Sequence, residues 1–282
     1  MSAVPRHLLV RAVIEALQED LGPGDVTTIA VAEADGRARA EILSRGQVVV
    51  AGIEPASMAF RLLDPDSRIL HAARDGERIE PGGSLMRIAG RAAALLSAER
   101  TALNFLSRLS GIATLTRKFV DAAAPHATAI FDTRKTAPGL RLLDKSAVVA
   151  GGGTNHRAGL WDAILIKDNH VDLAGGVGRA ISLARAKWPG AAVEVEVRSL
   201  AELDEALDAA AETVLLDNFG PPEIAAAVSR VRGRALVEVS GGVGLETVGE
   251  IAAMGVDRIS VGALTHSAPA ADLSMRMMKE RS

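Results

Sequence analysis

Basic residues follow two short apolar segments of this chain. Residues 129–131 lead into Asp132-Thr133-Arg134-Lys135-Thr136, and residues 163–166 lead into Lys167-Asp168-Asn169-His170. Positive charge at the end of a buried strand is costly unless an anion neutralises it. The pattern therefore predicts a pocket for a small molecule that carries several negative charges. The basic residues that we expect in this pocket are Arg134, Lys135, His156, Arg157 and Lys167.

A glycine triplet, Gly151–Gly153, lies between the two basic segments and precedes Thr154-Asn155-His156-Arg157. Taken alone, the triplet is typical of a flexible turn, a single histidine is more often structural, and residues 132–136 also suit a solvated loop. Their combination at strand ends favours an anion site instead. Lys167 supports this interpretation, because it directly follows three aliphatic residues and so places an ammonium at the strand end.

Carboxylates and glycines follow the later apolar segments. Glu196 alternates with valines in residues 193–197 and shares a face with Glu194, so we expect one of the two to face the inside of a barrel and to pair with a cation or metal. Asp217 ends residues 214–216, where it also suits the cap of the next helix. Backbone amides that could bind phosphate are expected in Ser240-Gly241-Gly242 and Val261-Gly262-Ala263.

The elements that position these residues alternate between strands and helices. Near-continuous apolar segments predict strands that are buried on both faces, and helical patterns separate most of them. Such repeats imply a parallel sheet, which is either closed as a barrel or open and doubly wound. Because polar residues gather where the strands end, we predict a β/α barrel. A closed β/α barrel has eight strands, so with six convincing strands the predicted barrel is incomplete or contains a further strand. The six strands are residues 129–131, 163–166, 192–195, 213–216, 235–239 and 258–261.

The first third of the chain has a different pattern. Residues 6–19 predict an amphipathic helix, and residues 37–90 predict a small α+β domain with short strands and one helix. Residues 91–124 are helical in pattern, and we expect Ser110-Gly111 to break them into two helices. This join is the predicted domain boundary.

Composition narrows the class of protein. The chain has 282 residues, of which 48% are hydrophobic, and its net charge of -3 argues against a dedicated nucleic-acid binder. Without cysteine it can form neither disulfides nor thiolate metal sites, which fits a reducing compartment. The sequence contains no secretory signal pattern and no long apolar run of the kind that crosses a membrane. These features predict a soluble cytoplasmic protein that binds neither nucleic acid nor membranes.

Eight sequence motifs, spread from about Asp20 to the C-terminal tail, resemble those of a known protein family. In chain order they read EDLGPGDVTT, SAERTALNFLSRLSGIAT, DTRKTAPG, GGGTNHRAGLWDAILIKDNH, VEVEV, LLDN, VSGGV and ISVGALTHSAPA. Together they resemble the quinolinate phosphoribosyltransferase family, whose activity is also called nicotinate-nucleotide pyrophosphorylase (carboxylating). The resemblance implies an α/β fold with an incomplete, seven-stranded β/α barrel at residues 111–267. An N-terminal α+β sandwich domain would span residues 1–110, and residues 268–282 would pack back on it.

The resemblance also implies a reaction and an assembly. Quinolinate and phosphoribosyl pyrophosphate (PRPP) would give nicotinate mononucleotide, pyrophosphate and carbon dioxide, with Mg2+ as cofactor, in de novo NAD biosynthesis. The subunits would form a homodimer, and a hexamer is left open. Quinolinate would be bound by Arg134, Lys135, His156 and Arg157, together with Arg100 of the partner subunit.

The remaining roles implied by the resemblance concern PRPP. Lys135 and Lys167 would face its phosphates, while Glu196 and Asp217 would hold the ribose hydroxyls and magnesium; these four residues form the implied catalytic set. Further substrate-binding positions are Thr133 and Val261. The 5-phosphate would lie against Ser240, Gly241, Gly242, Gly262 and Ala263.

Two positions depart from the family pattern, and three alternatives stay open. Arg198 stands where the family usually has an acidic or polar residue, and Val239 stands where serine is common. A molybdenum-transport-associated homologue of the same fold is the nearest alternative, although it typically departs at the NHR and LIKDNH strings, which are intact here. A Schiff-base aldolase or lyase that uses Lys167 is the second alternative. A non-catalytic phosphate-binding protein is the third.

Overall fold

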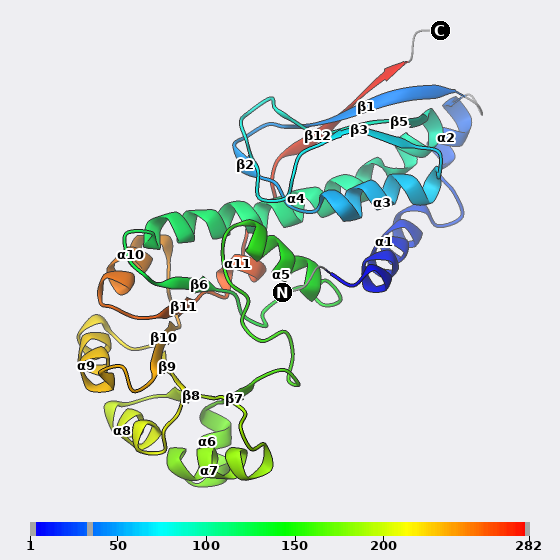
Figure 1. The fold of residues 1–282 in the computed structure, drawn as a ribbon. Helices are drawn as coiled ribbons and strands as arrows, with labels where there is room; N and C mark the ends of the chain where they lie inside the picture. Colours follow the sequence, from blue (N-terminus) through cyan, green and yellow to red (C-terminus); the bar gives the residue numbers. More distant parts are fainter. Residues whose placement is uncertain (1–3, 33–35, 280–282) are drawn as a thin grey trace. The chain divides into compact units, whose positions relative to one another are not determined.

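The computed structural model describes residues 4–32 and 36–279, which form two compact units (Figure 1). The first unit contains the chain up to Arg117, residues 136–152 and the chain from Leu264 onward. The second, here called the barrel unit, contains Lys118–Lys135 and Gly153–Ala263. Within the part of the chain described, no helix combines the length and the hydropathy that a membrane crossing requires.

The first unit is built on a four-stranded antiparallel sheet. Its strand order is β12-β1-β5-β3, with β1 at Arg37–Ser44, β3 at Arg68–Ala72, β5 at Ser84–Arg91 and β12 at Leu273–Lys279. Alternate residues of β1, including Ala38, Ala40 and Ile42, are buried, as expected for a strand with one face on a core. Because β12 pairs with β1, the C-terminal strand belongs to this unit.

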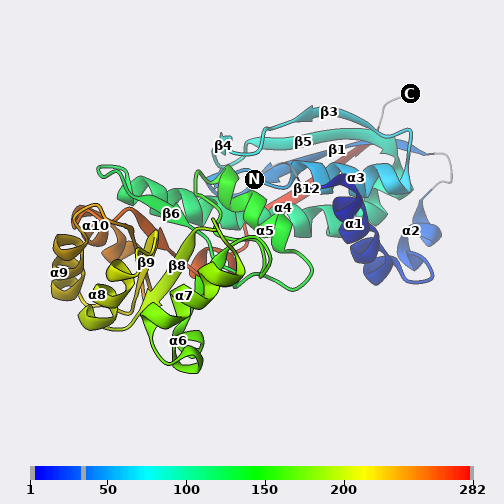
Figure 2. The ribbon, with the colours of Figure 1, turned by 60° about the horizontal axis from the view of Figure 1, so that its bottom comes forward.

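Helices cover one side of this sheet. Figure 2 shows β1, β3 and β5 lying against α3 (Ile53–Leu63) and α4 (Ala92–Ala123). The core between these layers contains Phe60, Met86 and Leu95, whose side chains are fully buried. The other elements of the unit are α1 (Arg6–Leu21), α2 (Val26–Val31), α5 (Arg141–Ala150) and a small sheet of β2 (Val48–Val49) and β4 (Arg78–Ile79).

The expected helix break at Ser110-Gly111 is wrong, because α4 runs without interruption from Ala92 to Ala123. Both residues serve close packing instead. The Ser110 hydroxyl donates a hydrogen bond to the carbonyl of Ala51 and accepts one from its amide. A Cβ added at Gly111 would lie 2.1 Å from the carbonyl oxygen of Pro269, so glycine lets the C-terminal segment cross the helix closely.

Gly111→Ala is therefore expected to destabilise the protein, although alanine is the better helix former. The added methyl group must displace the backbone at Pro269, and overpacking of this kind costs about 1–3 kcal/mol. Gly178→Ala in α7 (Val177–Lys187) is the matched control, because a Cβ there meets nothing within 4 Å. Chemical denaturation should show a lower free energy of unfolding for Gly111→Ala than for wild type, and a slightly higher one for Gly178→Ala. Equal stability of the two variants would contradict the packing argument.

The barrel unit contains six parallel strands in the order β6-β11-β10-β9-β8-β7. From β7 to β11 each strand neighbours the next one in the chain, and β11 pairs with β6, so the sheet curls as a barrel that is open between β6 and β7. A single parallel bridge from Phe131 to Thr154 lies on the open side of β6. The strands are β6 (Ala129–Phe131), β7 (Ile164–Ile166), β8 (Val193–Val197), β9 (Thr213–Asp217), β10 (Leu236–Ser240) and β11 (Arg258–Ser260).

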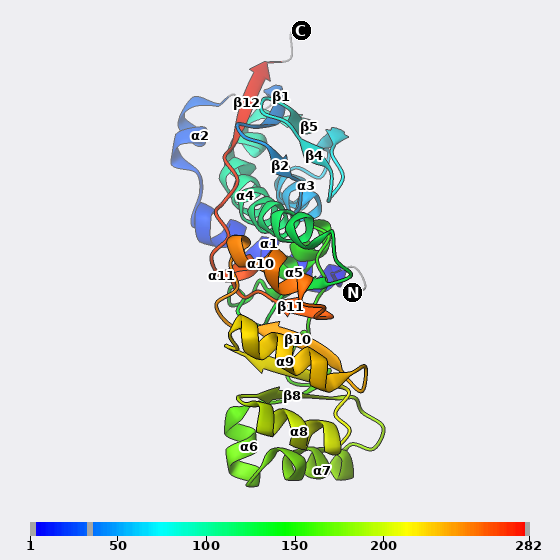
Figure 3. The same cartoon turned by 90° about the vertical axis from the view of Figure 1, so that its left-hand side faces the viewer.

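Helices pack along this sheet, as in other β/α folds. α8 (Leu200–Asp208) contacts β8 and its two neighbouring helices, α7 and α9 (Pro221–Val231) (Figure 3). The valines of β8 are fully buried, which explains the continuous apolar pattern of the strands. The remaining helices are α6 (Asp168–Ala174), α10 (Leu245–Ala253) and the short α11 (Ala263–His266). The α/β class with a separate antiparallel N-terminal sheet is thereby confirmed.

Candidate active site

Polar residues collect at the carboxyl ends of the barrel strands. Asp132 follows β6, Lys167 follows β7, and Glu196, Asp217 and Ser240 lie in the last two positions of β8, β9 and β10. Parallel strands that are neighbours in a sheet end at the same edge, so these side chains face one region. Residues 132–135 and 153–163 border the open seam between β6 and β7 and add the basic residues.

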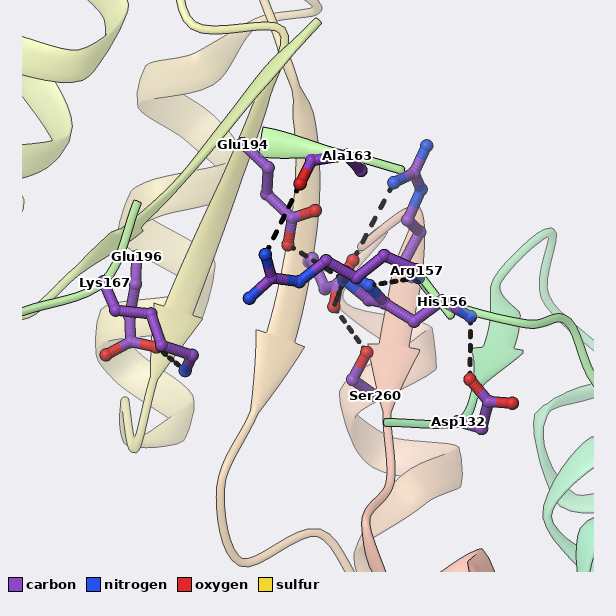
Figure 4. A network of polar contacts seen from close by, with 10 residues as sticks. Asp132, His156, Arg157, Ala163, Lys167, Glu194, Glu196 and Ser260 are labelled. Atoms are coloured by element: carbon purple, nitrogen blue, oxygen red, sulfur yellow. Dashed lines mark hydrogen bonds and ion pairs between the residues drawn. The ribbon is translucent and has the colours of Figure 1, made fainter. Parts of the chain in front are cut away.

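His156 lies at the centre of a buried polar cluster (Figure 4). Its Nε2 is 3.2 Å from Oε1 of Glu194 and 3.5 Å from Oε1 of Glu238. Its backbone amide donates to Oδ1 of Asp132 at 2.8 Å, and the Asp132 side chain is fully buried. The ring also contacts Phe131 edge to face. Contacts to the backbone, to both carboxylates and to an aromatic ring therefore hold the imidazole in place.

The hydrogen bond at Nδ1 of His156 shows which ring nitrogen carries the proton. Nδ1 accepts a hydrogen bond from the backbone amide of Arg157 at 2.7 Å, so it cannot itself carry a proton. The proton of the neutral imidazole must then lie on Nε2, which faces Glu194 and Glu238. In this geometry His156 is a neutral donor to carboxylates of the protein.

Glu238 is completely buried in this cluster, with no exposed side-chain surface. Burial and the nearby charge of Glu194 together raise the pKa of Glu238 to about 7. The Ser260 hydroxyl and Arg258 act in the opposite direction, as a protonated His156 would. Ser260 donates to Oε1 of Glu238, whereas Arg258 lies 3.9 Å from Oε2. Near neutral pH the cluster therefore gains or loses a proton at low cost.

Lys167 and Glu196 form an ion pair next to this cluster (Figure 4). The Lys167 Nζ is 2.6 Å from Oε2 of Glu196, and the lysine is half exposed while the glutamate is buried. A buried carboxylate needs such a partner. Schiff-base formation requires a neutral amine, and this ion pair opposes that step. The arrangement instead suits binding of an anion by the exposed ammonium.

Two arginines contribute positive charge to the same region. Burial lowers the pKa of Arg157, and the positive charge of Arg134 lowers it as well, whereas the carboxylates of Glu194 and Asp162 raise it. The Nε of Arg134 is buried and has no hydrogen-bond partner among the residues described. Arg157 donates to the carbonyl of Ala163 through one long contact of 3.4 Å. Two adjacent guanidinium groups repel each other, and a dianionic ligand would relieve that repulsion.

The phosphate-binding candidates lie at the ends of the last strands. Asn218 follows Asp217, has a positive φ of 58°, and donates from Nδ2 to Oδ2 of Asp217 at 2.8 Å. Gly241 has a φ of +94°, and a Cβ there would lie 2.2 Å from Oδ1 of Asn218. Only glycine fits this close approach. The tight turn exposes Gly241 and Gly242 at the edge of the sheet, as phosphate binding by backbone amides requires.

The structure places the predicted site residues in two groups. Arg100 lies in α4 within the first unit, whereas all the other predicted residues lie in the barrel unit. Lys135 is exposed, and its amide donates to the hydroxyl of Thr133. Lys167 and Glu196 meet at the carboxyl ends of β7 and β8, whereas His156 contacts Glu194 in the first half of β8 and Arg157 contacts Ala163 just before β7 (Figure 4). Val261, Gly262 and Ala263 connect β11 to α11.

The sequence predicted that one of Glu194 and Glu196 faces the inside of the barrel. In the structure both side chains do. Both are buried, with Glu194 at His156 and Glu196 at Lys167. Sequence reasoning missed Glu238, although a signal was present. A carboxylate in the middle of an apolar strand, as in Val237-Glu238-Val239, is as costly to bury as Glu196 and needs a partner in the same way.

Neither departure from the family pattern contacts this cluster. Arg198 lies on the surface, where Asp172 and Glu202 bind its guanidinium and hold its pKa above the ordinary value. Val239 is buried in β10 and faces away from Glu238 and Ser240, because successive strand residues alternate between faces. The presence of Arg198 and Val239 at these two positions therefore leaves the residues around His156 undisturbed.

A metal ion has two candidate locations in the barrel unit. The ligand atoms of His156, Glu194 and Glu238 lie within 4.8 Å of one another. However, Nδ1 of His156 accepts a hydrogen bond, so Nε2 keeps its proton and is not available as a ligand. Glu196 and Asp217, on neighbouring strands, offer carboxylate oxygens at the edge of the sheet, which are the donors that Mg2+ prefers.

Comparison with known proteins gives matches over nearly the whole chain. The model of the quinolinate phosphoribosyl transferase N-terminal domain matches residues 25–110, and that of the C-terminal domain matches residues 112–276. Quinolinate phosphoribosyltransferase (decarboxylating) 1b of Nicotiana tabacum is 42% identical, over 99% of this chain and 85% of the tobacco protein. A probable nicotinate-nucleotide pyrophosphorylase (carboxylating) of Archaeoglobus fulgidus is 41% identical, over 91% of this chain and 99% of its own length.

Solved structures agree with these relatives. The nicotinate-nucleotide pyrophosphorylase of Francisella tularensis superposes with a TM-score of 0.93 at 39% identity, and the alignment covers 98% of each chain. A structure from Streptococcus pyogenes gives a TM-score of 0.95 at 38% identity and covers 100% of both chains. This chain is therefore similar in sequence and fold to the two solved structures over at least 98% of each chain.

Proposed function

The chain belongs to the quinolinate phosphoribosyltransferase family, and we propose that it transfers the phosphoribosyl group of PRPP to the ring nitrogen of quinolinate. The products are nicotinate mononucleotide, pyrophosphate and carbon dioxide, so the enzyme acts in de novo NAD biosynthesis. The observation that carries the proposal is the Lys167–Glu196 ion pair at the carboxyl ends of β7 and β8, in the same unit as Arg134 and Arg157, whose positive charges act on each other. The barrel unit offers both an anion pocket and a carboxylate for a developing cation.

Quinolinate binding is assigned to the basic residues around the open seam. Its two carboxylates are adjacent on the pyridine ring and match the neighbouring guanidinium groups of Arg134 and Arg157. Lys135 and Lys167 are exposed and bind the phosphates of PRPP. Because His156 faces Glu194 and Glu238, we assign it to holding Arg157 in place.

The transfer step needs no nucleophile from the protein. The ring nitrogen of quinolinate attacks the anomeric carbon of PRPP as the bond to pyrophosphate breaks, and positive charge develops on the ribose. Glu196 and Asp217 stabilise this charge from the ends of β8 and β9. Their carboxylates would also hold a magnesium ion, which would neutralise charge on the departing pyrophosphate. Lys167 contributes a further positive charge to the leaving group.

Decarboxylation follows from the charge of the alkylated ring. The positive ring nitrogen accepts the electron pair that the 2-carboxylate leaves behind, and a proton then takes the place of carbon dioxide. Arg134 and Arg157 hold the neighbouring carboxylate during this step. Binding the 2-carboxylate in a poorly solvated position would favour its loss.

Turnover of quinolinate with PRPP and magnesium tests the proposal directly. Nicotinate mononucleotide and carbon dioxide should appear in equal amounts. Borohydride treatment in the presence of carbonyl compounds should leave Lys167 unmodified. No product from folded protein that still binds either substrate would overturn the proposal in favour of the molybdenum-transport-associated homologue. Binding without turnover of any substrate would favour the phosphate-binding alternative.

A homodimer in which Arg100 completes the partner's site is part of the proposal. Large apolar side chains are exposed in each unit, including Val26 and Ile29 at 78% and 74%, and Leu160 and Trp161 at 72% and 80%. Apolar surface of this kind usually marks an interface. The cytoplasm is the proposed location, although some plant relatives carry organellar names. Further association into hexamers stays open.

Mixing two inactive variants tests the shared site. Arg100→Ala and Lys167→Ala should each be nearly inactive alone, because each damages both sites of its own dimer. After subunit exchange, half of the dimers are mixed and each contains one intact site, so about a quarter of normal activity should return. Analytical ultracentrifugation checks that exchange occurs within dimers. If Arg100 serves the site of its own subunit, exchange will restore nothing.

A further inference from the structure

Glu238 has no role in the reaction described so far, yet its side chain is fully buried beside His156. We propose that Glu238 is a positioning residue, which holds His156 as the neutral Nε2–H form so that the histidine can fix Arg157 for quinolinate binding. The inference rests on the quinolinate-binding role proposed for Arg157. It concerns the interior of the barrel unit alone.

The first step of the argument is the contact between His156 and Arg157. Nδ1 of the imidazole accepts the backbone amide of Arg157 at 2.7 Å, and this bond exists only while Nδ1 carries no proton. A second proton on the ring would place two donors against each other and push Arg157 away. Correct placement of Arg157 therefore depends on a neutral His156.

The second step is the orientation of the ring. Nε2 donates toward Glu194 at 3.2 Å and lies 3.5 Å from Oε1 of Glu238. Ser260 donates to the same oxygen of Glu238 and thereby fixes the carboxyl group. These groups come from β8, β10 and β11, which are rigid strands of the barrel. The contacts leave the ring one orientation, in which Nδ1 faces the amide of Arg157 (Figure 4).

The third step is the charge of the cluster. The charged and titratable groups that face Glu238 are Glu194 from β8, His156 from the segment between α5 and β7, and Arg258 from β11. If Glu238 and Glu194 were both ionised, two buried negative charges would lie together at Nε2 of His156. A proton held by Glu238 removes one of these charges. The interior of the barrel unit is then less negative, which favours binding of a dianion.

Loss of this proton is expected to weaken quinolinate binding. Burial raises the pKa of Glu238 to about 7, so the carboxyl is mostly neutral below pH 7 and mostly ionised above it. The KM for quinolinate should therefore rise about tenfold between pH 6 and pH 8.5, while kcat at saturating substrates changes little. The carboxylates of quinolinate are ionised over this whole range and add no step of their own.

Glu238→Gln tests the proposal, because the amide has the same shape and cannot ionise. The variant should fold, turn over quinolinate, and lack the rise of KM near pH 7. Glu238→Leu removes both the donor and the acceptor and should raise the KM for quinolinate about tenfold at every pH, with the KM for PRPP unchanged. Glu205→Gln, an exposed position on α8, is the matched control and should keep the wild-type profile.

The outcomes separate this inference from the proposed function. If wild-type protein turns over no quinolinate, the proposed function fails and the inference fails with it. If wild type is active and Glu238→Gln keeps the rise of KM near pH 7, the inference alone is overturned. If Glu238→Leu does not fold, calorimetric titration of Glu238→Gln with quinolinate at pH 6 and pH 8.5 decides the matter. Equal affinities at the two pH values support the proposal, and a tenfold loss contradicts it.

Discussion

Arg134→Ala is expected to lower kcat/KM for quinolinate by about 30- to 5000-fold. The side chain lies beside Arg157, and its buried Nε has no hydrogen-bond partner among the residues described, so the group is available to a ligand. Losing one partner of a buried, hydrogen-bonded charge pair costs about 2–5 kcal/mol, which corresponds to that range. Removing a guanidinium also leaves one substrate carboxylate unpaired in a poorly solvated site.

Steady-state kinetics with PRPP held at saturation measures this effect. The loss should appear mainly in the KM for quinolinate if Arg134 binds ground state and transition state equally, and in kcat if it acts during decarboxylation. Arg134→Lys should recover part of the activity, because lysine keeps the charge and loses the planar fork. Arg230→Ala is the matched control, since Arg230 is an exposed residue that pairs with Asp204 on the outside of the barrel unit. An Arg134→Ala enzyme with normal kinetics would contradict the assigned role.

Glu196→Gln is expected to lower kcat by about 100- to 1000-fold, the usual cost of removing one charge-stabilising group from an active site. The carboxylate is buried and lies 2.6 Å from Nζ of Lys167. Its loss removes negative charge from the region where the ribose becomes positive, and it leaves the lysine without its counter-charge. It also removes one proposed magnesium ligand, so the magnesium concentration for half-maximal rate should rise.

A double-mutant cycle with Lys167→Met separates these contributions. If the two residues act as a pair, the fold-decrease in kcat of the double variant will be much smaller than the product of the fold-decreases of the two single variants. Asp204→Asn on the exposed face of α8 is a suitable control for removal of a carboxylate. Unchanged kcat and unchanged magnesium dependence in Glu196→Gln would rule out both roles of Glu196. A shift in magnesium dependence without a loss of kcat would leave only the metal role.

Several features followed from the sequence by itself. Apolar segments that end in charge predicted the strands of the barrel and the polar residues at their carboxyl ends, because burial on both faces and the direction of parallel strands are local properties of the pattern. Basic residues at two strand ends predicted an anion pocket. Family motifs then indicated quinolinate phosphoribosyltransferase, which the relatives and solved structures confirm.

Other features were decided by tertiary structure. Ser110-Gly111 reads as a helix break in the sequence, whereas the fold uses the two residues for close packing against Ala51 and Pro269, which lie far away in the chain. The fold also joins β11 to β6 and leaves the barrel open beside β7, a pairing that strand patterns cannot specify.

The partners of buried charges also depend on the fold. Alternation with valines placed Glu194 and Glu196 on one face, but only strand tilt and loop placement decided that Glu196 meets Lys167 while Glu194 and Glu238 meet His156. The protonation of Glu238 depends on groups from three separate segments, because electrostatic interactions act through space and not along the chain. Residue types therefore determined what chemistry the site can perform, and packing determined which groups perform it.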